Sequence, residues 1–376
     1  MQKNKLQVIH ILNNLEKGGK EKNVLDICRN IDDNNFSCFI LCLYNSEKEE
    51  YLINSPKIKV VRLNLLKNKS VFVQLFLNIF QIKKIYTLIK KHKPDIIHTH
   101  TFFYSVLPII ICVHFIKKAK HFHTIHTGGM HYINKTFFNK IKLYIEKSSY
   151  SFNNTTLIAI SSILESKLQR LFPNRKISYV QNGIDLNFEH KNLYVNTNYT
   201  FLNGVYVARL VDGKNHITIL KALSELKKCD IKFRFTFIGG GPLNDHLVQT
   251  SYDLGIKENV NFTGDIENVN SILDSFNFGV FASEYEGFSL ALIEMMSVGM
   301  PVFVSNSQTI LDMGVNDENS ILFETHNYLE LKSLIVDLFN DHIKIEKYSK
   351  KAKEYAKNFG VEKMIFQLQS TYLALK

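Results

Sequence analysis

The sequence predicts an α/β fold made of two doubly wound domains. Short apolar, β-branched runs alternate with longer segments of helical periodicity, which is the pattern of βαβ units and parallel sheets. The chain has 376 residues, and a single core stops growing near about 250–300 residues. Because each half has enough strand candidates for its own sheet, we expect two domains.

The strand candidates form one set in each half of the chain. In the first half they are residues 6–12, 36–44, 58–64, 95–100, 121–127, 156–161 and 177–182. In the second half they are residues 200–210, 233–241, 259–264, 278–283 and 301–306. A turn at 182–185 followed by a polar stretch predicts a linker. We therefore place the domains at residues 1–185 and 186–356, with a C-terminal helix at 357–376.

Composition indicates a soluble globular protein, with 45% hydrophobic and 22% charged residues. No charged-then-apolar leader opens the sequence, and apolar runs such as 71–80 fall short of the roughly 20 residues of a membrane span. The five cysteines include no C-x-x-C pair. Reduced thiols and a cytoplasmic location are therefore expected.

The net charge of +11 is unevenly distributed. Residues 1–185 hold 28 basic and 12 acidic residues, whereas residues 186–376 hold 18 and 23. The first of these segments therefore has a net charge of +16 and the second of −5. One interpretation of the positive charge is a solvated lysine-rich surface. Another is a surface for anionic lipid headgroups or an anionic acceptor. Nucleic acid is disfavoured because no binding motif accompanies the charge.

Two segments of the first half carry candidate ligand contacts. Gly18 and Gly19 lie between a strand and a helix, where a backbone can approach an anion, although a plain tight turn explains them too. His126 lies at the end of a strand, where open α/β sheets bind ligands, and Gly128-Gly129 follow it. His98 and His100 are weaker candidates of the same kind. His121 and His123 share a strand face, but no nearby Cys or carboxylate completes a metal site.

Two cations follow a strand of the second half. Arg209 lies at the end of the expected strand 200–210, and Lys214 precedes a helix. This arrangement suits a diphosphate. The alternative is a solvated basic loop. The glycine turns at 239–241 and Gly264 indicate close packing of strand and helix, and only weakly a phosphate loop.

The stretch EYEGFSLALIEMMSVGMPV is the most specific motif. Its helix is expected from Phe288 to Ser297, with a glycine C-cap. Glu286 precedes the helix and can accept hydrogen bonds from sugar hydroxyls. Glu294 lies inside a nearly all-apolar helix, where a carboxylate is costly unless paired. It could accept from a ribose diol or from a neighbouring backbone or lysine group.

The ordered set of motifs resembles the retaining glycosyltransferases of family four, which have the GT-B fold. The resemblance rests on Glu286-x7-Glu294 with SVGMPV, and on GG-x-E at 18–21, DIIHTH, HTIHT, VQNGID, ARLVDGKNH, IGGGPL and FTG. It implies two Rossmann-like domains facing a central cleft, the first for the acceptor and the second for a nucleotide-sugar donor. The C-terminal helix would pack back on the first domain.

The resemblance also implies roles for individual residues. Arg209 and Lys214 would hold the donor diphosphate, Glu294 the ribose, Glu286 the sugar hydroxyls, and His126 the sugar near its anomeric centre. The implied catalytic set is His126, Arg209, Lys214 and Glu286. The implied donor-binding set is Gly18, Gly19, Arg209, Lys214, Gly264, Glu286, Gly287, Phe288, Ser289, Leu290 and Glu294. No metal and no cofactor are implied.

The expected activity is transfer of a hexose or N-acetylhexosamine from a nucleotide-sugar to a saccharide acceptor, with a UDP-sugar favoured over a GDP-sugar. The acceptor would be lipid-linked, at the inner face of the cell membrane, in capsule, O-antigen or exopolysaccharide synthesis. Alternatives are a non-hydrolysing UDP-sugar epimerase and a non-catalytic basic membrane-binding protein. The sequence departs from the family between residues 306 and 320, where a glycine pair and a glutamate are missing, and at Lys20 beside Gly19.

Overall fold

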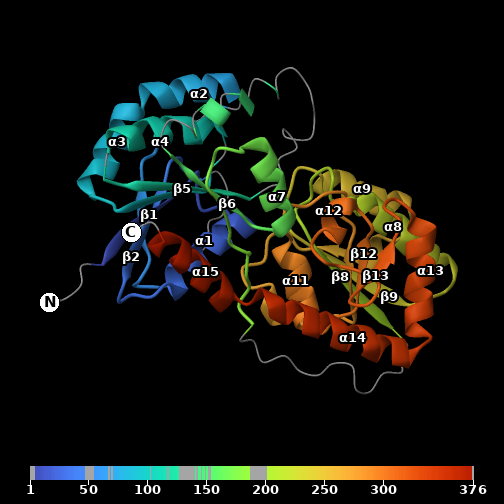
Figure 1. The fold of residues 1–376 in the computed structure, drawn as a ribbon. Helices are drawn as coiled ribbons and strands as arrows, with labels where there is room; N and C mark the ends of the chain where they lie inside the picture. The colour runs from blue at the N-terminus through green and yellow to red at the C-terminus, as the bar shows by residue number, and fades with distance from the viewer. Residues whose placement is uncertain are drawn as a thin grey trace. The chain divides into compact units, whose positions relative to one another are not determined.

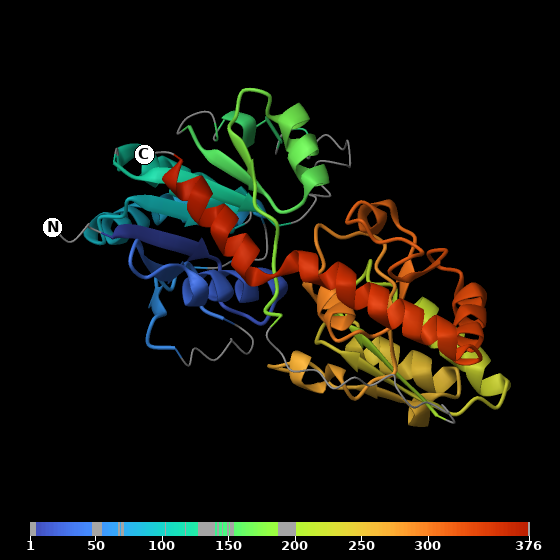
Figure 2. The same cartoon turned by 60° about the horizontal axis from the view of Figure 1, so that its bottom comes forward.

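The computed structural model describes residues 5–46, 55–66, 68, 71–101, 103–116, 118–126, 140, 143–144, 146–148, 150, 154–186 and 201–374. The chain folds into two compact units (Figures 1 and 2). The first comprises Met1–Gly183 with Val361–Lys376, and the second comprises Ile184–Gly360. Gly128, Gly129 and nearly all of the expected linker lie outside the described residues.

The first unit contains a seven-stranded parallel sheet in the order β3-β2-β1-β4-β5-β6-β7. Its strands are β1 (Leu6–Leu12), β2 (Phe36–Cys42), β3 (Lys59–Arg62), β4 (Ile96–Thr99), β5 (Lys120–Ile125), β6 (Thr156–Ala159) and β7 (Ile177–Tyr179). Its helices include α1 (Gly19–Asn30), α2 (Val71–Phe80), α3 (Ile82–Lys91), α4 (Phe103–Phe115), α7 (Ser162–Leu171) and α15 (Val361–Leu373).

The two faces of this sheet are covered by different helices, because side chains alternate along each strand. Ile9 and Ile11 of β1 pack in one cluster with apolar residues of α3 and α4. Val8 packs in another cluster with residues of α1 and α15. The C-terminal helix α15 therefore packs on the first unit, as expected (Figure 2). Its Tyr372 is buried there.

The second unit contains a six-stranded parallel sheet in the order β10-β9-β8-β11-β12-β13. Its strands are β8 (Leu202–Val207), β9 (Phe233–Ile238), β10 (Val260–Phe262), β11 (Phe278–Phe281), β12 (Val302–Ser305) and β13 (Ile321–Phe323). Its helices are α8 (His216–Lys228), α9 (Asn244–Asp253), α10 (Asn270–Leu273), α11 (Leu290–Ser297), α12 (Gln308–Leu311), α13 (Tyr328–Phe339) and α14 (His342–Ala356), with 3-10 turns η1 (Lys257–Asn259) and η2 (Lys357–Phe359).

Both sheets confirm the predicted doubly wound α/β class. Each of the twelve apolar runs contains a strand, usually trimmed at its ends. The strand β13 was not predicted, because its three residues are too short to form a recognisable run. Among the described residues, no helix combines the length and apolarity needed to cross a bilayer.

Candidate active site

The strand order of the second unit has a switch point between β8 and β11. These strands are neighbours, and the chain continues from β8 to β9 on one side and from β11 to β12 on the other. Ligands of open α/β sheets bind at such a switch point, beyond the carboxyl ends of the strands. Arg209 and Lys214 follow β8, and Glu286 follows β11, so the fold brings these predicted residues to one edge of the sheet.

Lys214 and Glu286 form an ion pair between the Nζ and Oε1 atoms. The two side chains are only 23% and 14% exposed. Tyr206 donates its hydroxyl to the Lys214 carbonyl at 2.9 Å, and the Glu286 N–H donates to Thr309 Oγ1 at 2.9 Å. Burial raises the pKa of Tyr206 well above its usual value, so the phenol stays a donor. The sequence-based reasoning missed Tyr206, Thr309 and the pairing itself.

Two loops hold this pair in place. The Glu284 N–H donates to the Gly213 carbonyl at 2.9 Å, which joins the loop after β8 to the loop after β11. Gly213 has φ +79°, and a Cβ there would lie 2.7 Å from the Tyr285 hydroxyl. Another residue would be strained at this φ and would have to displace the Tyr285 ring, so the position directly before Lys214 favours glycine.

Arg209 is exposed and follows the end of β8 by two residues. Within the described part of the chain it makes no ion pair. A guanidinium that is exposed at the carboxyl end of the sheet and not neutralised is available to an anionic ligand.

Helix α11 begins at Leu290, two residues later than expected, because Ser289 is its N-cap and accepts from the Leu292 N–H at 3.3 Å. Gly287 and Phe288 therefore lie in the preceding loop. The helix ends at Ser297, as expected, and Gly299 with φ +76° follows. The Gly299 and Met300 N–H groups bond the carbonyls of Met296 and Met295, which is a Schellman motif. Glu294 is 6% exposed.

The glycine turn after β9 is explained by backbone packing. Gly239 has φ +136°, and a Cβ there would lie 2.2 Å from the Ala208 carbonyl oxygen. Its N–H donates to the Gly264 carbonyl at 2.8 Å, and Gly264 itself has φ +70°. Both turns therefore require glycine for conformational reasons, whether or not a ligand approaches.

Gly241→Ala is expected to destabilise the second unit by about 2–4 kcal/mol. Its Cβ would lie 2.2 Å from the Leu210 carbonyl oxygen, which is backbone and cannot move aside freely. Gly240→Ala is the matched control, because its Cβ would meet only the Asp265 side chain, at 3.0 Å. Urea unfolding curves measure both. Equal stabilities for the two variants would contradict the packing argument.

The first unit has its own switch point, between β1 and β4. Gly18 is the N-cap of α1 with an extended φ of −170°, and Gly19 is the first helical residue. Lys20 pairs with Glu21 at 2.9 Å. Nearby, a cavity of about 10 Å³, the size of one water molecule, has polar groups from Asn23, His98, His100, Thr124, His126 and Asn182 in its lining.

Histidines form a hydrogen-bonded chain at this edge. His10 Nδ1 lies 3.0 Å from His100 Nε2, and His100 Nδ1 lies 3.0 Å from His126 Nε2. His10 and His98 are direct neighbours across β1 and β4. The chain orients His126, the predicted sugar contact, through a residue that sequence reasoning did not consider, His10. The signal that could have found His10 is its position in the strand β1, where it pairs with His98 of the strand β4.

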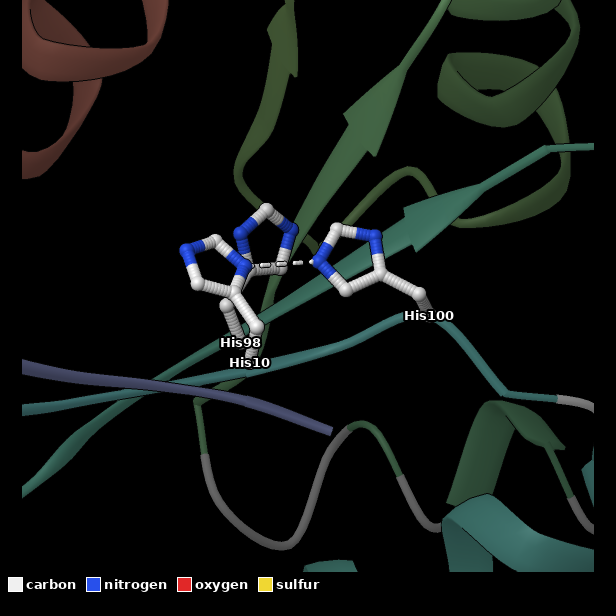
Figure 3. A group of neighbouring side chains, drawn as sticks. All are labelled: His10, His98 and His100. Atoms are coloured by element: carbon white, nitrogen blue, oxygen red, sulfur yellow. Dashed lines mark hydrogen bonds between the residues drawn. The ribbon is translucent and has the colours of Figure 1, made fainter. Parts of the chain in front are cut away.

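The three imidazoles of His10, His98 and His100 come close enough to share an ion, with one nitrogen of each within 4.8 Å of the others (Figure 3). His98 bonds Tyr372 at 2.6 Å and Thr124 at 2.7 Å. Hydrogen bonds thus account for both ring nitrogens of His98 and of His100. The arrangement is a buried polar network. Among the described residues, His10 Nε2 is the one nitrogen of these three rings that has no hydrogen-bond partner.

His121 and His123 do share a strand face, since both lie near Thr99 Oγ1, at 3.1 and 2.8 Å. His121 Nδ1 also bonds Thr155 Oγ1 at 2.9 Å, and the His123 ring stacks on Tyr150. Both histidines therefore have structural partners.

Comparisons with known proteins agree with this geometry. Residues 17–188 match the family described as "Glycosyltransferase Family 4", and residues 193–359 match "Glycosyl transferases group 1". The capsular polysaccharide biosynthesis glycosyltransferase CapH of Staphylococcus aureus is 25% identical over 80% of this chain and 81% of its own. The UDP-Gal:alpha-D-GlcNAc-diphosphoundecaprenol alpha-1,3-galactosyltransferase of Escherichia coli is 22% identical over 90% and 89%.

Among solved structures, sucrose-phosphate synthase of Thermosynechococcus elongatus superposes with a TM-score of 0.80 at 18% identity, over 99% of each chain. This likeness and the two parallel sheets confirm the GT-B fold. Two adjoining family matches account for most of the chain, and the motif order runs through both. The protein is therefore a glycosyltransferase of family four.

Proposed function

We propose that the protein transfers a hexose or N-acetylhexosamine from a UDP-sugar to a lipid-linked saccharide, with retention of anomeric configuration, in the synthesis of a bacterial surface polysaccharide. The observation that carries the proposal is the Lys214–Glu286 pair at the β8/β11 switch point, where the exposed Arg209 also follows β8. One cation and one carboxylate, mostly buried at a ligand-binding edge, suit a donor that has both a diphosphate and sugar hydroxyls.

The ion pair keeps both charges compensated before the donor binds. A bare buried lysine or glutamate would be costly. The donor can replace each partner, because its diphosphate offers oxygens to Lys214 and Arg209 while its sugar hydroxyls donate to Glu286. Glu294 would accept from the ribose, and the N–H groups of Gly287, Phe288, Ser289 and Leu290 would approach phosphate or sugar.

The chemistry follows from charge neutralisation at the leaving group. The bond between the anomeric carbon and the diphosphate oxygen breaks, and the acceptor oxygen bonds to the same face of that carbon. The acceptor proton passes to the departing phosphate, so no enzymic base is needed. Arg209 and Lys214 would stabilise the charge that develops on the diphosphate, without a metal ion. His126, oriented by His100, would contact the sugar near the anomeric centre.

The relatives support the choice of substrates. The name of the E. coli relative specifies a UDP-sugar donor and a diphosphoundecaprenol acceptor, and CapH is named for capsule synthesis. An acceptor on a lipid also suits a chain whose first half has a net charge of +16, since anionic inner-leaflet lipids attract basic surfaces.

A thermal-shift screen tests the donor. UDP-sugars should raise the melting temperature more than GDP-sugars at equal concentration, because a ligand that binds only the folded state stabilises it. Transfer is then measured with the best donor and an undecaprenyl-diphosphate-linked saccharide. If no nucleotide-sugar raises the melting temperature, the proposal is wrong.

Glu294→Ala is expected to lower kcat/KM by about 100-fold or more, since a buried site built to accept from two hydroxyls loses both bonds. Glu294→Gln keeps the shape and one acceptor, and should fall between the wild type and Glu294→Ala. If Glu294 instead has a structural role, the melting temperature will fall while the nucleotide-induced shift persists. Measuring both quantities on both variants separates these outcomes.

A further inference from the structure

The helix α2 has polar side chains on its inner face. Gln74 and Asn78 are only 2% and 1% exposed. Asn78 Oδ1 accepts from the Tyr44 hydroxyl at 2.9 Å and from Gln74 Nε2 at 2.8 Å. Gln74 also donates to the Leu66 carbonyl at 3.1 Å. This buried network fixes which face of α2 points inward.

The outer face of α2 is apolar, the reverse of an ordinary surface helix. Four of its side chains are strongly exposed: Val73 at 45%, Phe76 at 65%, Ile79 at 44% and Phe80 at 75%. The rings of Phe76 and Phe80 lie 5.3 Å apart. Leu66, 65% exposed, is held near the same helix through its N–H bond to Gln81 Oε1. Figure 1 shows α2 on the outer side of the first unit.

The charges around this face decide what can cover it. Exposed lysines follow immediately in α3, at Lys83 and Lys84 and again at Lys90 and Lys91. Between residues 51 and 145, Asp95 is the only acidic residue. A second copy of the chain would place lysines against lysines. An anionic bilayer satisfies both features, because phenylalanines enter the headgroup–acyl boundary while lysines contact lipid phosphates.

We propose that α2 inserts its apolar face into an anionic lipid bilayer and docks the first unit there. The helix has ten residues, about 15 Å of length, so it lies in the plane of the interface and does not cross it. Only the link to a membrane-borne acceptor rests on the proposed function; the lipid contact stands on the surface itself.

Vesicle co-sedimentation tests the proposal, with phosphatidylcholine alone and with phosphatidylcholine containing phosphatidylglycerol. The wild type should bind the anionic vesicles, and more weakly at high salt. Phe76→Ser with Phe80→Ser should weaken binding at least about tenfold, since two large apolar side chains no longer insert. Lys83→Gln with Lys84→Gln should weaken binding and reduce its salt dependence.

The matched control is Phe366→Ser. Phe366 is 73% exposed and lies on α15, which packs on the opposite face of the sheet. Unchanged binding by the Phe76/Phe80 variant, or an equal loss in the Phe366 variant, would overturn the proposal. A concentration-dependent dimer that the Phe76/Phe80 substitutions abolish, without vesicle binding by the wild type, would overturn it too and assign the face to a second copy.

The same proteins separate this inference from the proposed function. The Phe76/Phe80 variant should keep the wild-type thermal shift with nucleotide-sugar. Vesicle binding without any nucleotide-sugar shift would support the docking helix and remove the proposed transfer reaction. A nucleotide-sugar shift without vesicle binding would do the opposite.

Discussion

Lys214→Ala should lower kcat/KM for transfer by about 100–1000-fold, the loss typical when a group that stabilises developing charge is removed. Two interactions hold Lys214 at the β8/β11 edge. Its carbonyl accepts a hydrogen bond from the Tyr206 hydroxyl, and its Nζ pairs with Glu286. The substitution also leaves Glu286 mostly buried without its cation. Because the pair is partly exposed to solvent, we expect only about 1–2 kcal/mol of lost stability. The variant should therefore remain folded and lose nearly all transfer activity.

Lys228→Ala is the control for this prediction. Lys228 also pairs with a glutamate, Glu225, but the lysine is 67% exposed on the same unit. Its removal should change neither turnover nor stability measurably. Steady-state kinetics over a range of nucleotide-sugar concentrations, with melting temperatures for each variant, give the comparison. A Lys214→Ala enzyme with more than a tenth of the wild-type kcat/KM would show that the lysine has been misassigned.

Acid should unfold the first unit before the second. Burial lowers the pKa of His121 to about 3 and of His123 to about 4, and lowers those of His98, His100 and His126 well below the usual value. In the unfolded chain each histidine has a pKa near 6.5, so it gains a proton there first as pH falls. The free energy of unfolding therefore declines below about pH 6.5.

The size of this effect is a substantial part of the stability of a domain. At pH 5 a buried histidine whose pKa is lowered to about 3 or 4 costs about 2 kcal/mol, so His121 and His123 together cost about 4 kcal/mol. A typical total is about 5–15 kcal/mol, and the lowered pKa values of His98, His100 and His126 act in the same direction. In the second unit, burial and then Lys214 lower the pKa of His216 to about 4, and its expected loss is about 2 kcal/mol.

Hydrogen exchange read by mass spectrometry at pH 7 and pH 5, corrected for intrinsic rates, locates the change. Peptides of the first unit should lose protection at pH 5 while those of β8 and β11 keep it. His123→Phe keeps a ring on Tyr150 and should reduce the loss between the two pH values by about 2 kcal/mol. His326→Gln removes a 64% exposed histidine and should change nothing. Equal protection of both units at pH 5 would contradict the prediction.

Local sequence patterns predicted most of the fold because strands and helix ends obey short-range rules. Apolar β-branched runs located twelve strands, and Ser297 with Gly299 predicted the end of α11. The strand β13 escaped, since three residues contain too little periodicity. The start of α11 was placed two residues early, because Ser289 can be either a helical residue or a cap, and the sequence alone does not distinguish them.

By itself, the sequence determined the doubly wound α/β class, the family, and the residues Arg209, Lys214, Glu286 and His126 as candidates for the site. Only the tertiary structure decided how they are held. The Lys214–Glu286 pair joins residues 72 apart, and His10 meets His100 across 90 residues. The outward apolar face of α2 was equally hidden, because periodicity shows two faces of a helix but not which one a buried Gln74–Asn78 network turns inward. Such contacts depend on strand order and on packing, which no short stretch of sequence contains.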